Sequence, residues 1–145
     1  MAKFSTGLRN YSLATGSIKQ ALANSEIRLF SGTPPAHADS ALSGDSVLLC
    51  VLIGDVGRFN FDATAADGIL TKEPTLVIQG EILATGVPTF YRHVQAADTD
   101  GYSNAHVRIQ GSVGLVGTDM ELSNTSLVQG GMQRLSSHSV VLTEE

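Results

Sequence analysis

A strict alternation of side chains along residues 89–94 is the feature that most limits what this chain can fold into. Successive side chains of an extended chain point to opposite faces, so a period of two indicates a β-strand. The two faces carry Phe90, Arg92 and Val94 on one side and Thr89, Tyr91 and His93 on the other. Residues 107–113 alternate in the same way, with Val107, Ile109 and Val113 on one face. Both segments are predicted strands.

The segment that precedes this strand predicts a hairpin. Residues 76–83 form another apolar run, and residues 85–88 connect it to the strand. In this connection Gly86 can adopt a positive φ, and Pro88 cannot donate to a central hydrogen-bond ladder. Together with residues 107–113, these runs predict a three-stranded antiparallel meander at the centre of a sheet.

Strand signals recur at short intervals along the rest of the chain. Further strands are predicted at residues 26–31, 46–53, 59–63, 69–71 and 132–142, with weaker signals at 121–123 and 127–128. A short buried helix is the alternative for residues 46–53, because an apolar run of that length suits either structure. Strands do not alternate with helices, which argues against an α/β fold. We therefore expect an all-β protein, an antiparallel β-sandwich or jelly roll of about eight strands.

Residues 5–23 carry the one helical pattern. Ser5 or Thr6 can cap a short helix, and Gly16 suits a left-handed stop at its end. Ser17 can then cap a second short helix. We interpret this segment as a small lid that closes one end of the sandwich.

Length and charge limit the possible functions. With 145 residues, the chain is predicted to form a single domain over residues 1–145. The net charge is −5 and the 9 Lys and Arg are scattered, which argues against nucleic-acid binding. No apolar run is long enough to cross a membrane, and the N-terminus lacks the apolar core of a secretory signal. We expect synthesis in a cytoplasm, without export through a membrane pathway.

No motif in the sequence predicts catalysis or a cofactor. The segment Asp98-Thr99-Asp100-Gly101 resembles the start of a calcium loop, but Ile109 stands at the twelfth position, where an EF-hand needs Glu. An Asx turn is the preferred interpretation. The lone cysteine, Cys50, lies in an apolar run and is interpreted as a core residue.

The histidines do not have metal-ligand spacing. Folding could bring His93 and His106 together across neighbouring strands, but a zinc site needs three or four converging ligands. We therefore predict no metal, no cofactor and no enzymatic activity.

Several segments, in order along the chain, resemble a family of small virion proteins from tailed bacteriophages. These segments are residues 3–10, 27–36, 84–92 and 108–111. The resemblance implies a capsid decoration, or cement, protein with a jelly-roll sandwich that docks on the outside of the head shell. It also implies the major capsid protein as partner and a homo-oligomer, a dimer or trimer, on the capsid.

The predicted contact regions are the unpatterned segments at residues 1–7, 33–45, 96–105 and 143–145. Within them, the candidate contact residues are Lys3, Phe4, Pro34, Pro35, His37, Asp98, Asp100 and Tyr102. Two alternatives to the decoration role stay open: a tail or baseplate accessory that touches a host receptor, and a small hydrolase. Because residues 2–5 lack an apolar period, their deletion is expected to leave the fold about as stable as before and to weaken retention on heads.

Overall fold

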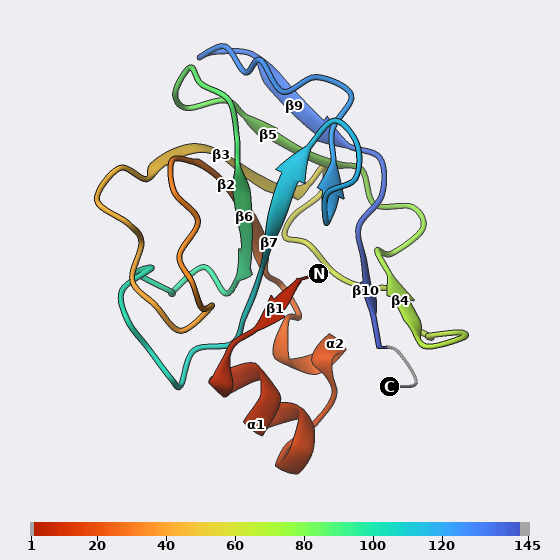
Figure 1. The fold of residues 1–145 in the computed structure, drawn as a ribbon. Coiled ribbons are helices and arrows are strands. Elements are labelled where there is room, and N and C mark those ends of the chain that lie inside the picture. Colours follow the sequence, from red (N-terminus) through yellow and green to blue (C-terminus); the bar gives the residue numbers. More distant parts are fainter. Residues whose placement is uncertain (1, 143–145) are drawn as a thin grey trace.

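The computed structural model describes residues 2–142 and has an all-β, sandwich-like fold (Figure 1). The strands of the large sheet lie in the order β1-β7-β6-β2-β3-β5-β9, and β8 pairs with β7 in parallel. Their bounds are β1 Lys3–Phe4, β2 Glu26–Ser31, β3 Val47–Gly54, β5 Ile78–Glu81, β6 Phe90–Val94, β7 Arg108–Gly114, β8 Met120–Glu121 and β9 Met132–Leu135. A second, two-stranded sheet pairs β4 (Ile69–Thr71) with β10 (Ser139–Val141). The predicted all-β sandwich class is confirmed.

The central strands are predicted correctly, but the hairpin is wrong. β6 pairs with β2 and β7, whereas β5 pairs with β3 and β9. The connection crosses the sheet instead of turning back: Ile82 bridges Cys50, and Gly86 exchanges backbone hydrogen bonds with Leu127. Gly86 does not have a positive φ. A Cβ at this position would lie 3.0 Å from the Leu49 side chain, which would have to shift by a few tenths of an ångström.

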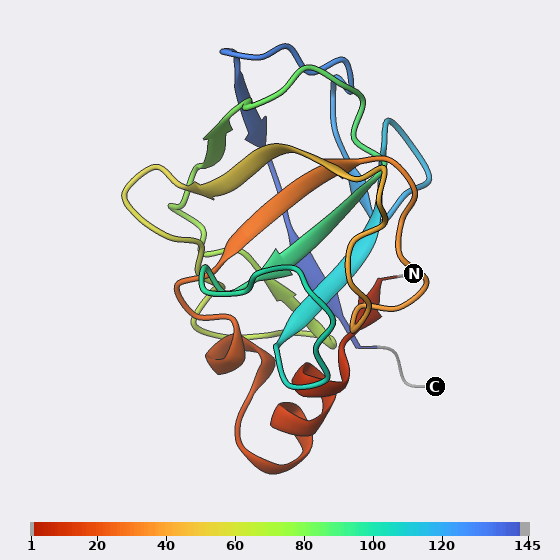
Figure 2. The same ribbon diagram turned by 90° about the vertical axis from the view of Figure 1, so that its left-hand side faces the viewer.

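The two faces of the large sheet are covered differently. The face that carries Ile27, Tyr91, His93 and Ile109 packs against the small sheet and against Phe59, and it forms the apolar core. The opposite face is covered by the loops at residues 32–46 and 95–107, which lie over β2, β6 and β7 in Figure 2.

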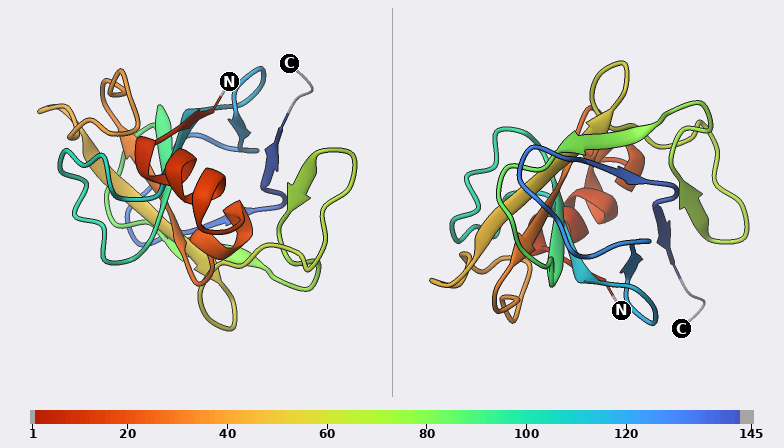
Figure 3. Two further views of the ribbon diagram at one scale, coloured as in Figure 1. Left: turned by 90° about the horizontal axis from the view of Figure 1, so that it is seen from below. Right: turned by 90° about the horizontal axis from the view of Figure 1, so that it is seen from above.

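Two short helices lie at one end of the sheet, as the lid interpretation expects (Figure 3). α1 (Thr6–Ala14) begins at Ser5, whose side chain accepts a hydrogen bond from the Leu8 N–H. α2 (Ile18–Ala21) begins at Ser17 with a capping box. Gly16 is not left-handed, so that prediction is wrong; α1 ends through Thr15 in a right-handed conformation. Across residues 2–142, no helix is long and apolar enough to span a bilayer.

The N-terminal arm belongs to the fold, contrary to the sequence-based expectation. Lys3 and Phe4 form β1 and pair with β7. Ser5 is 1% exposed. Its hydroxyl donates to the His106 carbonyl and accepts from the Arg108 N–H as well as from Leu8. A segment with these contacts cannot be removed without loss of stability, because buried backbone groups would lose their partners.

We expect Ser5→Ala to lower the free energy of unfolding by about 2–3 kcal/mol, because the helix loses its cap and two buried backbone groups lose a partner. Denaturant unfolding measures this difference. Ser12→Ala is the matched control, since Ser12 is an exposed residue of α1. Equal stabilities of the two variants would contradict the role of Ser5.

The position of Cys50 is confirmed: it is fully buried in β3. Burial raises the pKa of its thiol to about 11. We expect a thiol reagent to leave the native protein unmodified at pH 7 and to label Cys50 once a denaturant unfolds the chain. Rapid labelling without denaturant would show that β3 opens in the native state.

Candidate functional site

Three buried arginines line the loop-covered face of the large sheet. Arg28, Arg92 and Arg108 lie on the adjacent strands β2, β6 and β7. Arg28 lies directly opposite Arg92, and Arg108 lies opposite Val94. Arg92 and Arg108 are 0% exposed, and Arg28 is 8% exposed. Buried cations need partners, and these come from the covering loops.

Arg108 connects both loops to the sheet. It forms a bidentate pair with Asp98, at 2.6 Å and 2.8 Å. It also donates to the backbone carbonyls of Ala38 in the first loop and Gly101 in the second. Burial opposes ionisation of Asp98, but hydrogen bonds from Arg108 and from the Asp100 N–H outweigh it and hold the pKa of Asp98 below its ordinary value. The Asp100 N–H bond to Asp98 also confirms the predicted Asx turn.

Arg28 and Arg92 add further ties to the same loops. Arg28 pairs with Glu26 and Asp100, each at 2.7 Å. Arg92 donates to Gln110 at 2.9 Å and to the Ser40 carbonyl at 2.6 Å. The loops are therefore fixed by charged hydrogen bonds to the sheet rather than by apolar packing alone.

The two loops and the arm are also bonded to one another. Leu42 N–H donates to the Asp100 carbonyl, and Ser103 N–H donates to the Asp39 carbonyl. The Asp39 carboxylate accepts two hydrogen bonds from Thr6, which follows the arm. We call the exposed parts of residues 2–4, 33–45 and 96–105 the arm–loop surface.

The structure separates the predicted contact residues by exposure. Lys3, Pro34, His37 and Tyr102 are exposed on the arm–loop surface, Tyr102 with 72% of its surface accessible. Phe4 and Asp100 are half-buried, and Pro35 is buried.

Asp98 is 4% exposed and paired with Arg108. Pro35 and Asp98 are therefore corrected from surface contacts to supports of the loops. Residues 1 and 143–145, also predicted contacts, lie outside the described residues.

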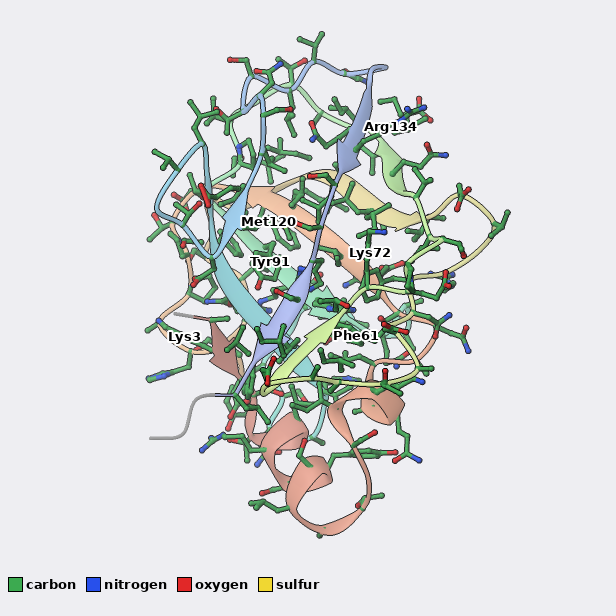
Figure 4. The ribbon with its side chains drawn as sticks, turned by 90° about the vertical axis from the view of Figure 1, so that its right-hand side faces the viewer. Lys3, Phe61, Lys72, Tyr91, Met120 and Arg134 are labelled. Carbon is green, nitrogen blue, oxygen red and sulfur yellow. The ribbon has the colours of Figure 1, made fainter. Side chains whose placement is uncertain are left out.

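A cleft of about 940 Å³ lies beside the arm, between β1 and β10. Phe4, Tyr91, Ile109 and Val140 contribute its apolar lining. Its lining also includes the polar side chain of His37 and the charged side chains of Lys3, Arg9, Asp39 and Asp119. In Figure 4, Lys3 lies to one side of β10 and Phe61 lies to the other. Because Lys3, His37 and Asp39 belong both to the cleft lining and to the segments of the arm–loop surface, the cleft is continuous with that surface.

A second polar cluster is buried in the apolar core. Ser25 Oγ lies 2.6 Å from His93 Nε2, and His93 Nδ1 lies 3.2 Å from His138 Nε2. Because the Ser25 hydroxyl donates to the Leu22 carbonyl, His93 Nε2 must be the donor to Ser25. Burial lowers the pKa of both imidazoles and so favours their neutral forms, and a neutral His93 with its proton on Nε2 uses Nδ1 to accept from His138 Nε2–H. The fold does not bring His93 and His106 together, because His93 lies opposite Ile109 and His106 is on an exposed loop.

This cluster is almost completely buried, with 7% of the His138 surface exposed. Ser25 and His93 are 0% exposed, and Phe59 and Phe61 pack their rings against both histidines. Burial lowers the pKa of His138 to about 4 and holds the pKa of His93 well below its ordinary value. Within residues 2–142, no group of three or more His, Cys, Asp or Glu side chains converges as metal ligands would.

Sequence reasoning placed Arg92 on the correct face but missed the arginine cluster. The signal that could have revealed it is the alternation within three predicted strands. Arg28, Arg92 and Arg108 each occupy a position on the face away from the apolar core. Recognising the cluster also required the strand order, which brings β2, β6 and β7 together.

Comparisons with known proteins give no match: no protein-family model, curated protein or solved structure is similar to this chain.

Proposed function

We propose that this chain is a non-enzymatic virion structural protein of a tailed bacteriophage, a decoration protein that binds the outer head shell. The observation that carries the proposal is the arm–loop surface. Buried ion pairs hold residues 96–105 on the sheet, and hydrogen bonds hold residues 33–45 and the arm beside them, so three segments that are distant in the sequence present exposed residues such as His37 and Tyr102. The resemblance of four segments to small phage virion proteins supports the same role.

The arginine cluster suits a surface that must bind without rearranging. Loops that are already ordered lose little conformational entropy when a partner docks. The proposed partner is the major capsid protein, and the protein would bind as a dimer or trimer at seams between its subunits. Repetition of a modest contact over the shell, and within each oligomer, increases retention through avidity.

Co-sedimentation with purified phage heads that lack this protein tests the proposal. The wild-type protein is expected to sediment with the heads. The double variant His37→Ala/Tyr102→Ala should weaken retention by about tenfold or more, because exposed aromatic side chains contribute strongly to interfaces. Val56→Ala is the matched control, since Val56 is 89% exposed at the opposite end of β3 from residues 33–45. If the wild-type protein does not sediment, the decoration role is wrong.

The exposed ring of Tyr102 also favours a second role, as a tail or baseplate accessory that touches a host receptor. The two roles differ in copy number. A decoration protein covers the shell in hundreds of copies, and a tail accessory is present in a handful. Quantitative mass spectrometry of the purified virion distinguishes them.

A further inference from the structure

The cleft beside the arm is bounded by two strand edges whose outward backbone groups form no hydrogen bond with another of residues 2–142. We propose that it binds an extended segment of a partner polypeptide, which adds as a strand between β1 and β10. The inference builds on the proposed function in that the partner segment would belong to the shell protein. The existence of a strand-binding site depends only on the geometry of the cleft.

The hydrogen-bond pattern of β10 shows which groups are unused. Leu142 N–H donates to Gly68, and the His138 carbonyl accepts from Lys72, so residues 138, 140 and 142 are directed towards β4. In an antiparallel pair, alternate residues direct their backbone groups to opposite edges. The N–H and C=O groups of Ser139 and Val141 therefore face away from β4, at the edge that borders the cleft.

The same reasoning applies to β1 on the other side of the cleft. Ser5 N–H donates to the Arg108 carbonyl, and Lys3 lies opposite Gln110. Residues 3 and 5 are thus directed towards β7, and the backbone groups of Phe4 face outward. Two edges that each offer donors and acceptors fit an extended polypeptide, because its backbone supplies both kinds of partner at strand spacing.

The lining of the cleft indicates which side chains such a segment would carry. Phe4, Tyr91, Ile109 and Val140 form an apolar lining, which suits alternate apolar residues. Lys3 donates to the neutral carbonyl of Ala36.

The charged groups at the rim of the cleft are not equivalent. Arg9 donates to the hydroxyl of Thr6. Both carboxylates that line the cleft already accept hydrogen bonds: Asp39 from Thr6, and Asp119 from Ser112. The cations Lys3 and Arg9 form no ion pair with another described residue, so the segment should carry carboxylates near its ends.

This charge pattern favours a different protein over a second copy of this chain. The strand with a free outer edge at the far side of the sheet is β9, and its exposed side chains are Met132 and Arg134. Insertion of β9 from another copy would bring the cation of Arg134 and no carboxylate to a cleft that already carries Lys3 and Arg9.

The probe is a capped synthetic peptide, acetyl-Glu-Val-Thr-Val-Thr-Val-Glu-amide, titrated into the isotope-labelled protein and followed by NMR. The amide signals of Phe4, Ser139 and Val141 should shift, and their hydrogen exchange should slow. A peptide with Lys in place of both Glu residues should bind about fivefold more weakly, as expected for the loss of exposed charge pairs.

Ser139→Pro removes an outward N–H without removing a bond to β4, and it should weaken peptide binding by about tenfold, the effect of losing one edge hydrogen bond. Met132→Pro is the matched control at β9 and should bind as the wild type does. The inference is overturned if the peptide does not bind, if it protects Met132 and Arg134, or if the protein self-associates through the cleft. The exchange pattern of the wild type decides the question even if Ser139→Pro fails to fold. Because no heads are used, the result is independent of the proposed function.

Discussion

Replacing Asp98 with Asn is expected to lower the free energy of unfolding by about 3–5 kcal/mol, because Arg108 would remain buried without its charge partner. The bidentate pair is nearly inaccessible, with side chains that are 0% and 1% exposed. Asp98 also receives the Asp100 N–H, so the loss reaches the turn that positions the second loop. Urea unfolding of the wild type and the variant measures the difference.

Asp45→Asn is the matched control, since its exposed carboxylate accepts hydrogen bonds from Thr33 at the surface. We expect its stability to stay close to that of the wild type. If Asp98→Asn behaved like this control, the arginine cluster would not hold the loops, and the account of a fixed arm–loop surface would fail.

As the pH is lowered, the protein should begin to lose stability at a pH well above the range in which carboxylates titrate. His93 and His138 are buried as neutral rings, and their pKa values in the folded state lie below the unfolded value of about 6.5. Their contribution to stability is complete above pH 6.5, and it is lost as the pH falls towards about 4 because the unfolded chain binds protons first.

The slope for each ring is about 0.7 kcal/mol per pH unit at pH 6.5 and approaches about 1.4 below it, so the loss from both rings between pH 6.5 and 5 is about 3 kcal/mol. Chemical unfolding measured at half-unit steps between pH 7 and 5 tests this value. A flat profile in the wild type would show that the two buried rings accept protons without unfolding.

The local structure could be predicted where one segment carries its own signal. β2 has the predicted bounds, because Pro34 and Pro35 closely follow a short apolar run. The alternation in residues 89–94 also places Arg92 correctly, on the face of the sheet that Tyr91 does not share.

Strand pairing could not be predicted from the same patterns. The segment after β5 is determined by contacts with Leu127 and Gly131, which are distant in the sequence. A hairpin and a crossing connection have the same local composition, and only the long-range partners distinguish them.

The candidate site was predicted only in part, and the missing part again depends on contacts between segments that are distant in the sequence. Lys3, His37 and Tyr102 lie in polar segments and are exposed, as the sequence suggested. Asp98 lies in a segment of the same character, but its partner Arg108 is on a strand and buries it. Local polarity therefore predicted loops correctly and did not distinguish a surface carboxylate from a structural one.

A cryo-electron microscopy map of the virion would locate this protein on the particle. A decoration protein should appear as density for this fold in hundreds of copies on the outer head shell, with the arm–loop surface and the cleft directed towards the capsid subunits. Density confined to the tail or baseplate, or copies attached to the shell through the α1 end instead, would contradict this expectation.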